Sequence, residues 1–202
     1  MTKNLSFSPL DNLKQGIADS MAVKALLASD EATLAKVVEV GELMVQAFQR
    51  GNRVLFAGNG GSAADAQHLA AEFVSRFEFD RPGLPSLALS TDTSMLTAIG
   101  NDYGFEKLFR RQLEAQARPG DVFVGITTSG KSKNILAAFE VCKARQVTSI
   151  ALCGQGGELA GVDHVIRAPS LHTPRIQECH ILLGHMICAH VELAIFGHLA
   201  PT

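Results

Sequence analysis

The hydrophobic pattern of this chain changes its period after Gly51, and that change limits the folds open to it. Upstream of Gly51, apolar residues recur at helical spacing. Downstream of it, short continuous apolar runs alternate with amphipathic helical stretches. Continuous apolar strands that alternate with helices are typical of a parallel sheet covered on both faces. We therefore predict an α/β fold, a three-layer αβα sandwich around a five-stranded parallel sheet. The predicted strands are residues 53–58, 86–91, 122–127, 148–153 and 164–168.

Helical patterns account for most of the remaining chain. Ser8 or Asp11 is expected to cap the first helix. Ser29 or Asp30 is expected to cap the second, which Gly51 ends. The predicted helices are residues 8–28, 29–50, 62–77, 94–100, 105–117, 133–146 and 173–196.

The two N-terminal helices raise the question of domain organisation. Their apolar faces need a partner, which is either the sheet or another subunit. We predict that residues 1–43 form a helical arm that is part of the same compact unit. Residues 44–202 are then the main domain.

Composition and charge exclude several classes of protein. Hydrophobic residues make up 47% of the chain and charged residues 19%, as in ordinary globular proteins. A formal net charge of -2 gives no reason to expect a nucleic acid or an anionic membrane as partner. We find no signal peptide and no stretch of about 18 uncharged apolar residues, and therefore expect no membrane span.

The four cysteines support an intracellular location. They form no C-x-x-C pair and lie in apolar strand or helix contexts. Buried free thiols in a reducing compartment are the expected state, so we predict a cytoplasmic protein. These cysteines are Cys142, Cys153, Cys179 and Cys188.

Two loops are expected to carry the function, because ligands of a parallel sheet bind beyond the carboxyl ends of its strands. The first, GNGGSAADAQH, runs from Gly58 to His68. Its Gly60 and Gly61 permit a close backbone approach to a ligand, and Asn59 offers a donor and an acceptor. A tight turn with Ser62 as helix cap explains this loop equally well.

The second loop contains GITTSGKS, which satisfies the P-loop pattern G-x-x-x-x-G-K-[ST]. A strand-to-helix junction rich in hydroxyls and free backbone amides is a good phosphate site. A nucleotide triphosphatase also needs an acid at the end of another strand to hold Mg²⁺, and no predicted strand ends that way. A single phosphate ester is therefore favoured over a nucleotide. The hydroxyls belong to Thr127, Thr128, Ser129 and Ser132.

A metal or acid–base site is a further possibility. His68 and Glu72 stand at i and i+4 of one predicted helix, which places them about 40° apart on one face. Such a pair can share a divalent metal or transfer protons, although a helix-surface hydrogen bond is commoner. Spacing cannot choose among the polar residues of the last helix, where a core or interface histidine is the alternative. Those residues are Gln177, Glu178, His180, His185, His190 and His198.

Four motifs together resemble the phosphoheptose isomerases of the sugar-isomerase (SIS) domain family. They are GNGGSAADAQHLAAEFVSRF, TAIGNDYGFEKLF, GDVFVGITTSGKSKNI and RIQECHILLGH, and they stand in the order typical of that family. The resemblance covers nearly the whole chain. It implies the isomerisation of sedoheptulose 7-phosphate to D-glycero-D-manno-heptose 7-phosphate, an early step toward nucleotide-activated heptose for surface polysaccharide. It also implies a homotetramer whose active sites draw on more than one subunit.

The resemblance further implies site residues. One Zn²⁺ per subunit would be held by His68, Glu72, Gln177 and His185. Glu72 would be the base and His185 the acid–base partner in an enediol mechanism. The phosphate would bind Thr127, Thr128, Ser129 and Ser132. The sugar would contact Asn59, Gly60, Gly61, Glu72, Asn101, Asp102 and Gln177.

Three positions depart from the common family pattern. Thr127 replaces a serine but keeps the hydroxyl, and Lys131 adds a charge where asparagine is frequent. Pro174 stands where some members carry an acid, so a ligand contact from there is not expected. The alternative function is a non-catalytic SIS-fold adaptor that binds the replication initiator. We expect the enzyme, because adaptors of that kind do not keep the residues that match Glu72 and His185.

Overall fold

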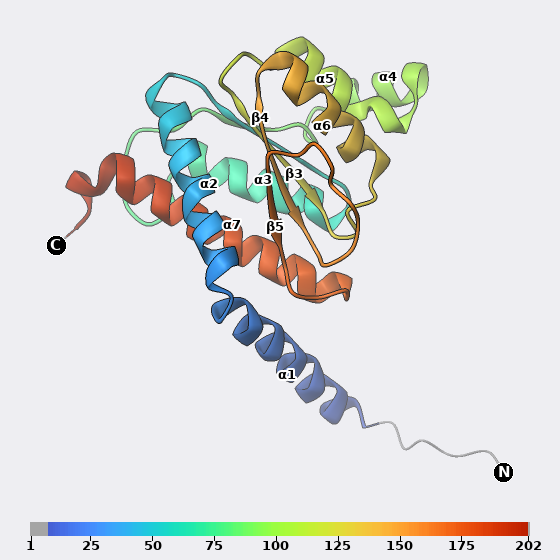
Figure 1. The fold of residues 1–202 in the computed structure, drawn as a ribbon, viewed down its shortest axis with the longest axis vertical. Helices are drawn as coiled ribbons and strands as arrows, with labels where there is room; N and C mark the ends of the chain where they lie inside the picture. Colours follow the sequence, from blue (N-terminus) through green and yellow to red (C-terminus); the bar gives the residue numbers. More distant parts are fainter. Residues whose placement is uncertain (1–7, 202) are drawn as a thin grey trace.

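The structure is a computed structural model and describes residues 8–201. It confirms the predicted α/β fold, with a five-stranded, all-parallel sheet in the order β2-β1-β3-β4-β5 (Figure 1). The strands are β1 (Val54–Gly58), β2 (Ser86–Ala88), β3 (Val122–Thr127), β4 (Thr148–Cys153) and β5 (His164–Arg167). The helices are α1 (Pro9–Ala28), α2 (Glu31–Gln49), α3 (Gly61–Val74), α4 (Thr93–Tyr103), η1 (Phe105–Lys107), α5 (Leu108–Gln116), α6 (Lys133–Arg145), α7 (Thr173–Phe196) and η2 (Gly197–Leu199).

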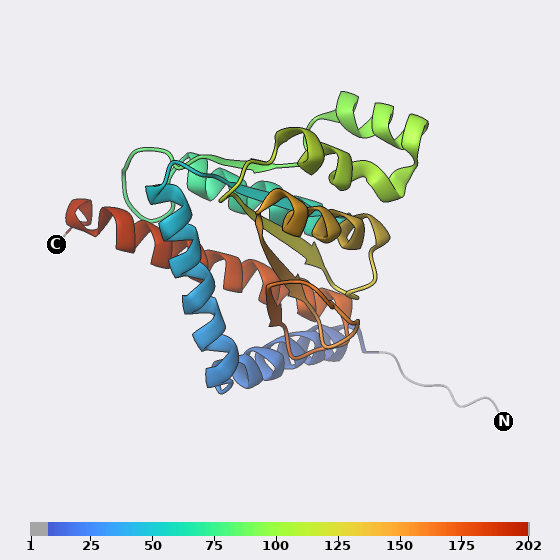
Figure 2. The same ribbon diagram turned by 45° about the horizontal axis from the view of Figure 1, so that its top comes forward.

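Helices cover both faces of the sheet, as the continuous apolar strands predict (Figures 1 and 2). Side chains alternate along β1: Val54 and Phe56 join the core formed with α2, α3 and α7. Leu55 and Ala57 join the core formed with α5 and α6. All residues of β1 and β3 are buried. The carboxyl ends of both strands therefore lie at one rigid edge, where the two predicted loops begin.

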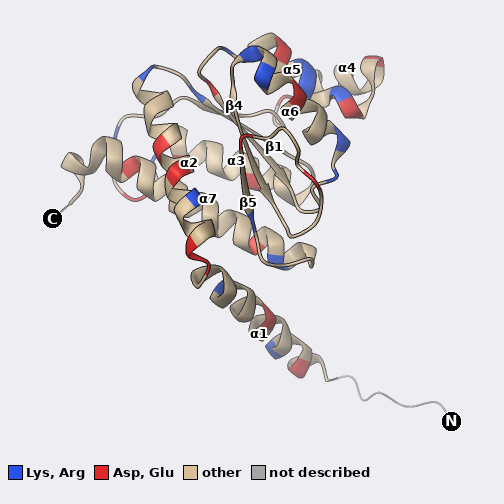
Figure 3. Ribbon diagram, viewed as in Figure 1, with Lys and Arg blue, Asp and Glu red and all other residues tan. Residues whose placement is uncertain are grey.

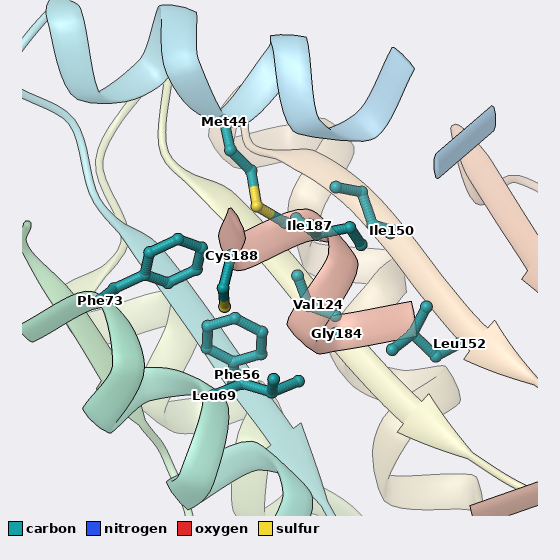
Figure 4. A pocket seen from close by; sticks show the side chains of 10 residues that line it. All are labelled: Met44, Phe56, Leu69, Phe73, Val124, Ile150, Leu152, Gly184, Ile187 and Cys188. Carbon is teal, nitrogen blue, oxygen red and sulfur yellow. The ribbon is translucent and has the colours of Figure 1, made fainter. Parts of the chain in front are cut away.

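The contact between α3 and α7 is unusually close, and a glycine makes it so. A Cβ atom on Gly184 would lie only 2.4 Å from the side chain of Leu69. Figure 4 shows Gly184 among the apolar side chains that fill this core, including Leu69 of α3 and Met44 of α2. The approach brings His185, the next residue of α7, onto α3.

Several predicted boundaries shift by a few residues. Ser8 caps α1 and Asp30 caps α2, each accepting a bond from a backbone N–H of the first turn. The second strand ends at Ala88 rather than Thr91, since the chain turns there into α4, which Asp92 caps. The predicted boundary between residues 43 and 44 falls within α2, and it stays a prediction.

The first helix projects from the body of the molecule (Figures 1 and 2). Its apolar residues are largely exposed; Leu13, for example, is 68% exposed. Polar contacts join it to α7, where Ser20 donates to Glu178 at 2.6 Å. The exposed apolar residues of α1 are Leu10, Leu13, Ile17, Met21 and Leu26.

The last helix is the one described segment that bears on the expectation of no membrane span. By length and composition alone, Thr173–Leu199 is long and apolar enough to cross a bilayer. Buried helices of globular proteins pass the same test, and 44% of the apolar window is buried in this protein. Leu183 and Val191 are completely buried against the sheet and its helices. Figure 3 shows acidic and basic residues interspersed over the visible face, in keeping with the small net charge.

Candidate active site

A cluster of three polar side chains lies where α3 and α7 meet. His68 Nε2 is 3.0 Å from Glu72 Oε1 and 2.9 Å from His185 Nε2. One ligand atom from each residue lies within 4.8 Å of the others. The His68 side chain is half exposed and that of Glu72 is 22% exposed, so the cluster is open to a ligand.

The donor chemistry of this cluster fits a divalent metal. Two imidazole nitrogens and a carboxylate oxygen converge on one point, which is the donor set that zinc prefers. The two nitrogens at 2.9 Å otherwise form a hydrogen bond in which only one of them carries a proton. Helical spacing left two interpretations of His68 and Glu72, a metal site or a surface hydrogen bond. The metal site is now favoured, because His185 of α7 adds a third ligand atom.

The structure distinguishes His185 from the other histidines of the last helix. His180 is fully buried, and burial lowers its pKa to about 4, so it is a neutral core residue. His190 pairs with Glu42 of α2 at 2.7 Å. His198 lies in η2, beyond the end of α7. None of these three belongs to the cluster.

Asp65 is a second acidic residue on α3, and its pKa is perturbed. It lies one turn before His68, and burial raises its pKa to about 6 even though His68 acts to lower it. Perturbed carboxylates of this kind gather at functional sites.

The glycine loop forms the entry to α3. Gly60 has φ +54° and occupies the cap position that we considered for Ser62. Asn59 and Asn134 exchange two amide hydrogen bonds, at 2.9 and 2.8 Å. A Cβ atom at Gly61 would lie 2.3 Å from Nε2 of Gln177. A side chain at position 61 would therefore displace the amide of Gln177 from the loop.

Gln177 lies beside the glycine loop and not in the histidine cluster of the same chain. It precedes His185 by eight residues, which is about 12 Å along a helix. Its predicted role as a fourth metal ligand stays a prediction. Its contact with Gly61 places it where the sugar contact was predicted.

The second loop leads from the end of β3 into the N-terminus of α6. Thr127 Oγ1 and Ser132 Oγ lie 3.0 Å apart and close the base of the loop. Ser129 Oγ accepts a bond from the backbone N–H of Lys131. Gly130 has φ +67° and packs against Gly157. Ser132 precedes the helix but makes no side-chain capping bond, since its hydroxyl pairs with that of Thr127.

Asn101 and Asp102 lie apart from the histidine cluster within one chain. Both are exposed near the end of α4, where Asn101 donates to Asp102 at 2.8 Å. The following segment, η1, packs on α6, and Glu106 pairs with Lys133 at 2.7 Å. The two residues are thus joined to the side of the molecule that carries the second loop.

One buried ion pair was not predicted from the sequence. Arg81 and Glu192 form an ion pair at 2.8 Å, with each side chain only 1% exposed. Glu192 also accepts bonds from the backbone of Phe77 and Glu78, and Arg81 donates to the carbonyl of Glu72. Burial alone would raise the pKa of Glu192, but these donors lower it below its usual value. The sequence did offer one sign of this pair, since Glu192 is an acidic residue within the apolar second half of α7.

This pair supports the histidine cluster. Phe77, held by Glu192, places its ring 5.3 Å from that of His185. The backbone carbonyl of Glu72 accepts a hydrogen bond from Arg81, and Glu72 is itself a member of the cluster. The segment after α3 is therefore part of the scaffold of the site.

Comparison with known proteins gives the class and then the family. Residues 20–154 match the family model of the SIS domain, which defines the class of protein. The chain is 56% identical over 188 residues to a phosphoheptose isomerase of Aneurinibacillus thermoaerophilus, covering 92% of this chain and 95% of the relative. It is also 56% identical over 187 residues to phosphoheptose isomerase 2 of Campylobacter jejuni, covering 92% and 93%. This chain therefore belongs to the phosphoheptose isomerase family.

The fold comparison agrees. The solved structure of a phosphoheptose isomerase from Neisseria gonorrhoeae is similar to this chain, with a TM-score of 0.84 and 40% sequence identity. The match covers 92% of this chain and 99% of that one. The predicted family and fold are confirmed, and these relatives give the adaptor alternative no support.

Proposed function

We propose that this protein isomerises sedoheptulose 7-phosphate to D-glycero-D-manno-heptose 7-phosphate. The observation that carries the proposal is the convergence of His68, Glu72 and His185 in a member of this family. The two loops at the same edge of the sheet supply an amide-lined and a hydroxyl-lined surface for a sugar phosphate. The protein would act in the cytoplasm. Its product would be used to make the nucleotide-activated heptose from which surface polysaccharide is built.

The proton transfers fall to Glu72 and His185. The Glu72 carboxylate removes a proton from C1 of the ketose, the carbonyl oxygen at C2 gains a proton, and a C1–C2 enediol forms. A proton then returns to C2 from the acid–base pair while O1 loses its own, which leaves the aldehyde at C1. The 3.0 Å and 2.9 Å contacts of His68 keep both groups at one point, as this exchange requires.

His68, Glu72 and His185 are also the residues that would hold Zn²⁺, and the proposed fourth ligand, Gln177, would have to come from another subunit of the assembly. The bound ion would polarise the substrate carbonyl and stabilise negative charge on its oxygen. One ion per subunit is proposed.

The rest of the substrate is assigned to the two loops. Thr127, Thr128, Ser129 and Ser132 would hold the phosphate at the positive N-terminus of α6. Lys131 is exposed at the rim, and its match to the P-loop lysine would be incidental. Phosphate binding far from C1 and C2 contributes free energy that orients the reacting carbons. The sugar contacts are assigned to Asn59, Gly60, Gly61, Glu72, Asn101, Asp102 and Gln177.

We expect a homotetramer in solution. The exposed apolar residues of α1 give a surface for another subunit, and Asn101 and Asp102, which are exposed, would be free to contribute to a site shared between subunits. Light scattering of the full chain should give about four times the chain mass of 21.5 kDa. A monomer at micromolar concentration would contradict the assembly.

The reaction is tested by incubating the protein with sedoheptulose 7-phosphate and following C1 and C2 by NMR. We expect an aldose signal to form, and we expect a strong chelator to suppress it until Zn²⁺ is restored. Elemental analysis of the purified protein gives the metal content independently. Turnover that a chelator leaves unchanged would contradict the metal, and an absence of any turnover with metal bound would contradict the isomerase.

A further inference from the structure

Asn134 is a buried polar side chain next to the two ligand loops. It lies at the second position of α6 and is 2% exposed. Its amide oxygen accepts from Nδ2 of Asn59 at 2.9 Å, and its own Nδ2 donates to Oδ1 of Asn59 at 2.8 Å. A buried amide with both groups paired in this way is held in one orientation.

The pair joins the loops that follow β1 and β3. Asn59 belongs to the glycine loop, and Asn134 follows the phosphate loop by two residues. The two strands are neighbours in the sheet, with Gly58 opposite Ile126. Two hydrogen bonds across this edge therefore fix the glycine loop relative to the hydroxyls that close the phosphate loop.

Asn59 is only half-buried, whereas Asn134 is almost completely buried. Each amide carries two N–H groups and two acceptor positions, and the pairing uses one of each. One donor and one acceptor position of Asn59 stay open, and Asn134 sets where they point.

We propose that Asn134 is a positioning residue that couples phosphate binding to the placement of the sugar. It touches neither the cluster of His68, Glu72 and His185 nor the reacting carbons. It acts through Asn59, by fixing the distance between the phosphate loop and the glycine loop. The kinetic part of this inference rests on the proposed isomerase function, whereas the structural coupling does not.

Kinetics of Asn134→Ala and Asn59→Ala test the coupling. We expect each to lower kcat by on the order of 10-fold to 100-fold, because small misplacements of a substrate cost that much. The affinity for inorganic phosphate should be unchanged, since the hydroxyl loop keeps its own bonds. The double variant should be no slower than Asn59→Ala, because Asn134 acts only through Asn59.

The matched control is Asn52→Ala. Asn52 bonds to the carbonyl of Pro119 and to Asp121, and so joins the same two strands at their opposite ends. It should lower the melting temperature but leave kcat unchanged. A fall in kcat equal to that of Asn134→Ala would overturn the coupling, as would additive effects or a loss confined to phosphate affinity.

A second measurement does not depend on catalysis. Inorganic phosphate is added to ¹⁵N-labelled protein, and the side-chain amide signals of Asn59 are followed. They should shift in the wild type and in Asn52→Ala, and stay fixed in Asn134→Ala. A shift that persists in Asn134→Ala overturns the inference. If the wild type shows the shift but no isomerase activity, the coupling stands and the proposed function fails.

Discussion

Glu72→Gln is expected to lower kcat for sedoheptulose 7-phosphate by about 10²-fold to 10⁴-fold, the usual contribution of a general base. A glutamine amide occupies the same volume but cannot accept the proton from C1. It also removes the only negative charge of the histidine cluster. The fold should persist, because the group that Arg81 holds is the backbone carbonyl of residue 72, which the substitution keeps.

Two measurements separate the roles of Glu72. Initial rates give kcat and KM, and elemental analysis gives the metal bound by the variant. Glu78→Gln is a suitable control, because Glu78 is exposed in the same segment and contributes its backbone N–H to Glu192. It makes the same change of charge and should retain full activity. A Glu72→Gln enzyme with near-wild-type kcat would remove Glu72 as the base.

Much of the fold was predictable because its signals are local. The last helix begins and ends where the apolar pattern indicates, at Thr173 and Phe196. The strands β3 and β4 agree with their predicted bounds, since continuous apolar runs in a buried parallel sheet are distinct from helical periodicity. The second strand was predicted too long, because its apolar run continues through Leu89 after the pairing with β1 has ended.

The site could be predicted only in part from local patterns. Helical spacing places His68 beside Glu72, but it cannot tell which residue of another helix meets them. That choice depends on the packing of Gly184 on Leu69, a contact between distant segments. The resemblance to the family supplied His185, and the geometry then brings it to His68. The pairing of Asn59 with Asn134 could not be predicted from local patterns either, because 75 residues separate the two in the sequence.

Glu192→Ala is expected to reduce the free energy of unfolding by about 3–5 kcal/mol, the usual result of leaving a buried charge unpaired. Arg81 would stay buried without its carboxylate, and the backbone N–H groups of Phe77 and Glu78 would lose their acceptor. Denaturant unfolding of wild type and variant gives the difference. A loss below about 1 kcal/mol, typical of an exposed pair, would contradict this account.

Glu192→Gln keeps the protein measurable if the alanine variant does not fold. The amide can still accept hydrogen bonds, so we expect a smaller loss of unfolding free energy than in Glu192→Ala. We also expect a lower activity, because Phe77 is held less firmly against His185.

The pH dependence of stability gives an independent check. Because the pKa of Glu192 is lower in the folded than in the unfolded state, its stabilising effect is full above the unfolded value. It is lost as the pH falls through the folded value. The stability of the wild type should therefore decline with acid more steeply than that of Glu192→Gln, and equal slopes would mean that the carboxylate is not bound as the structure shows.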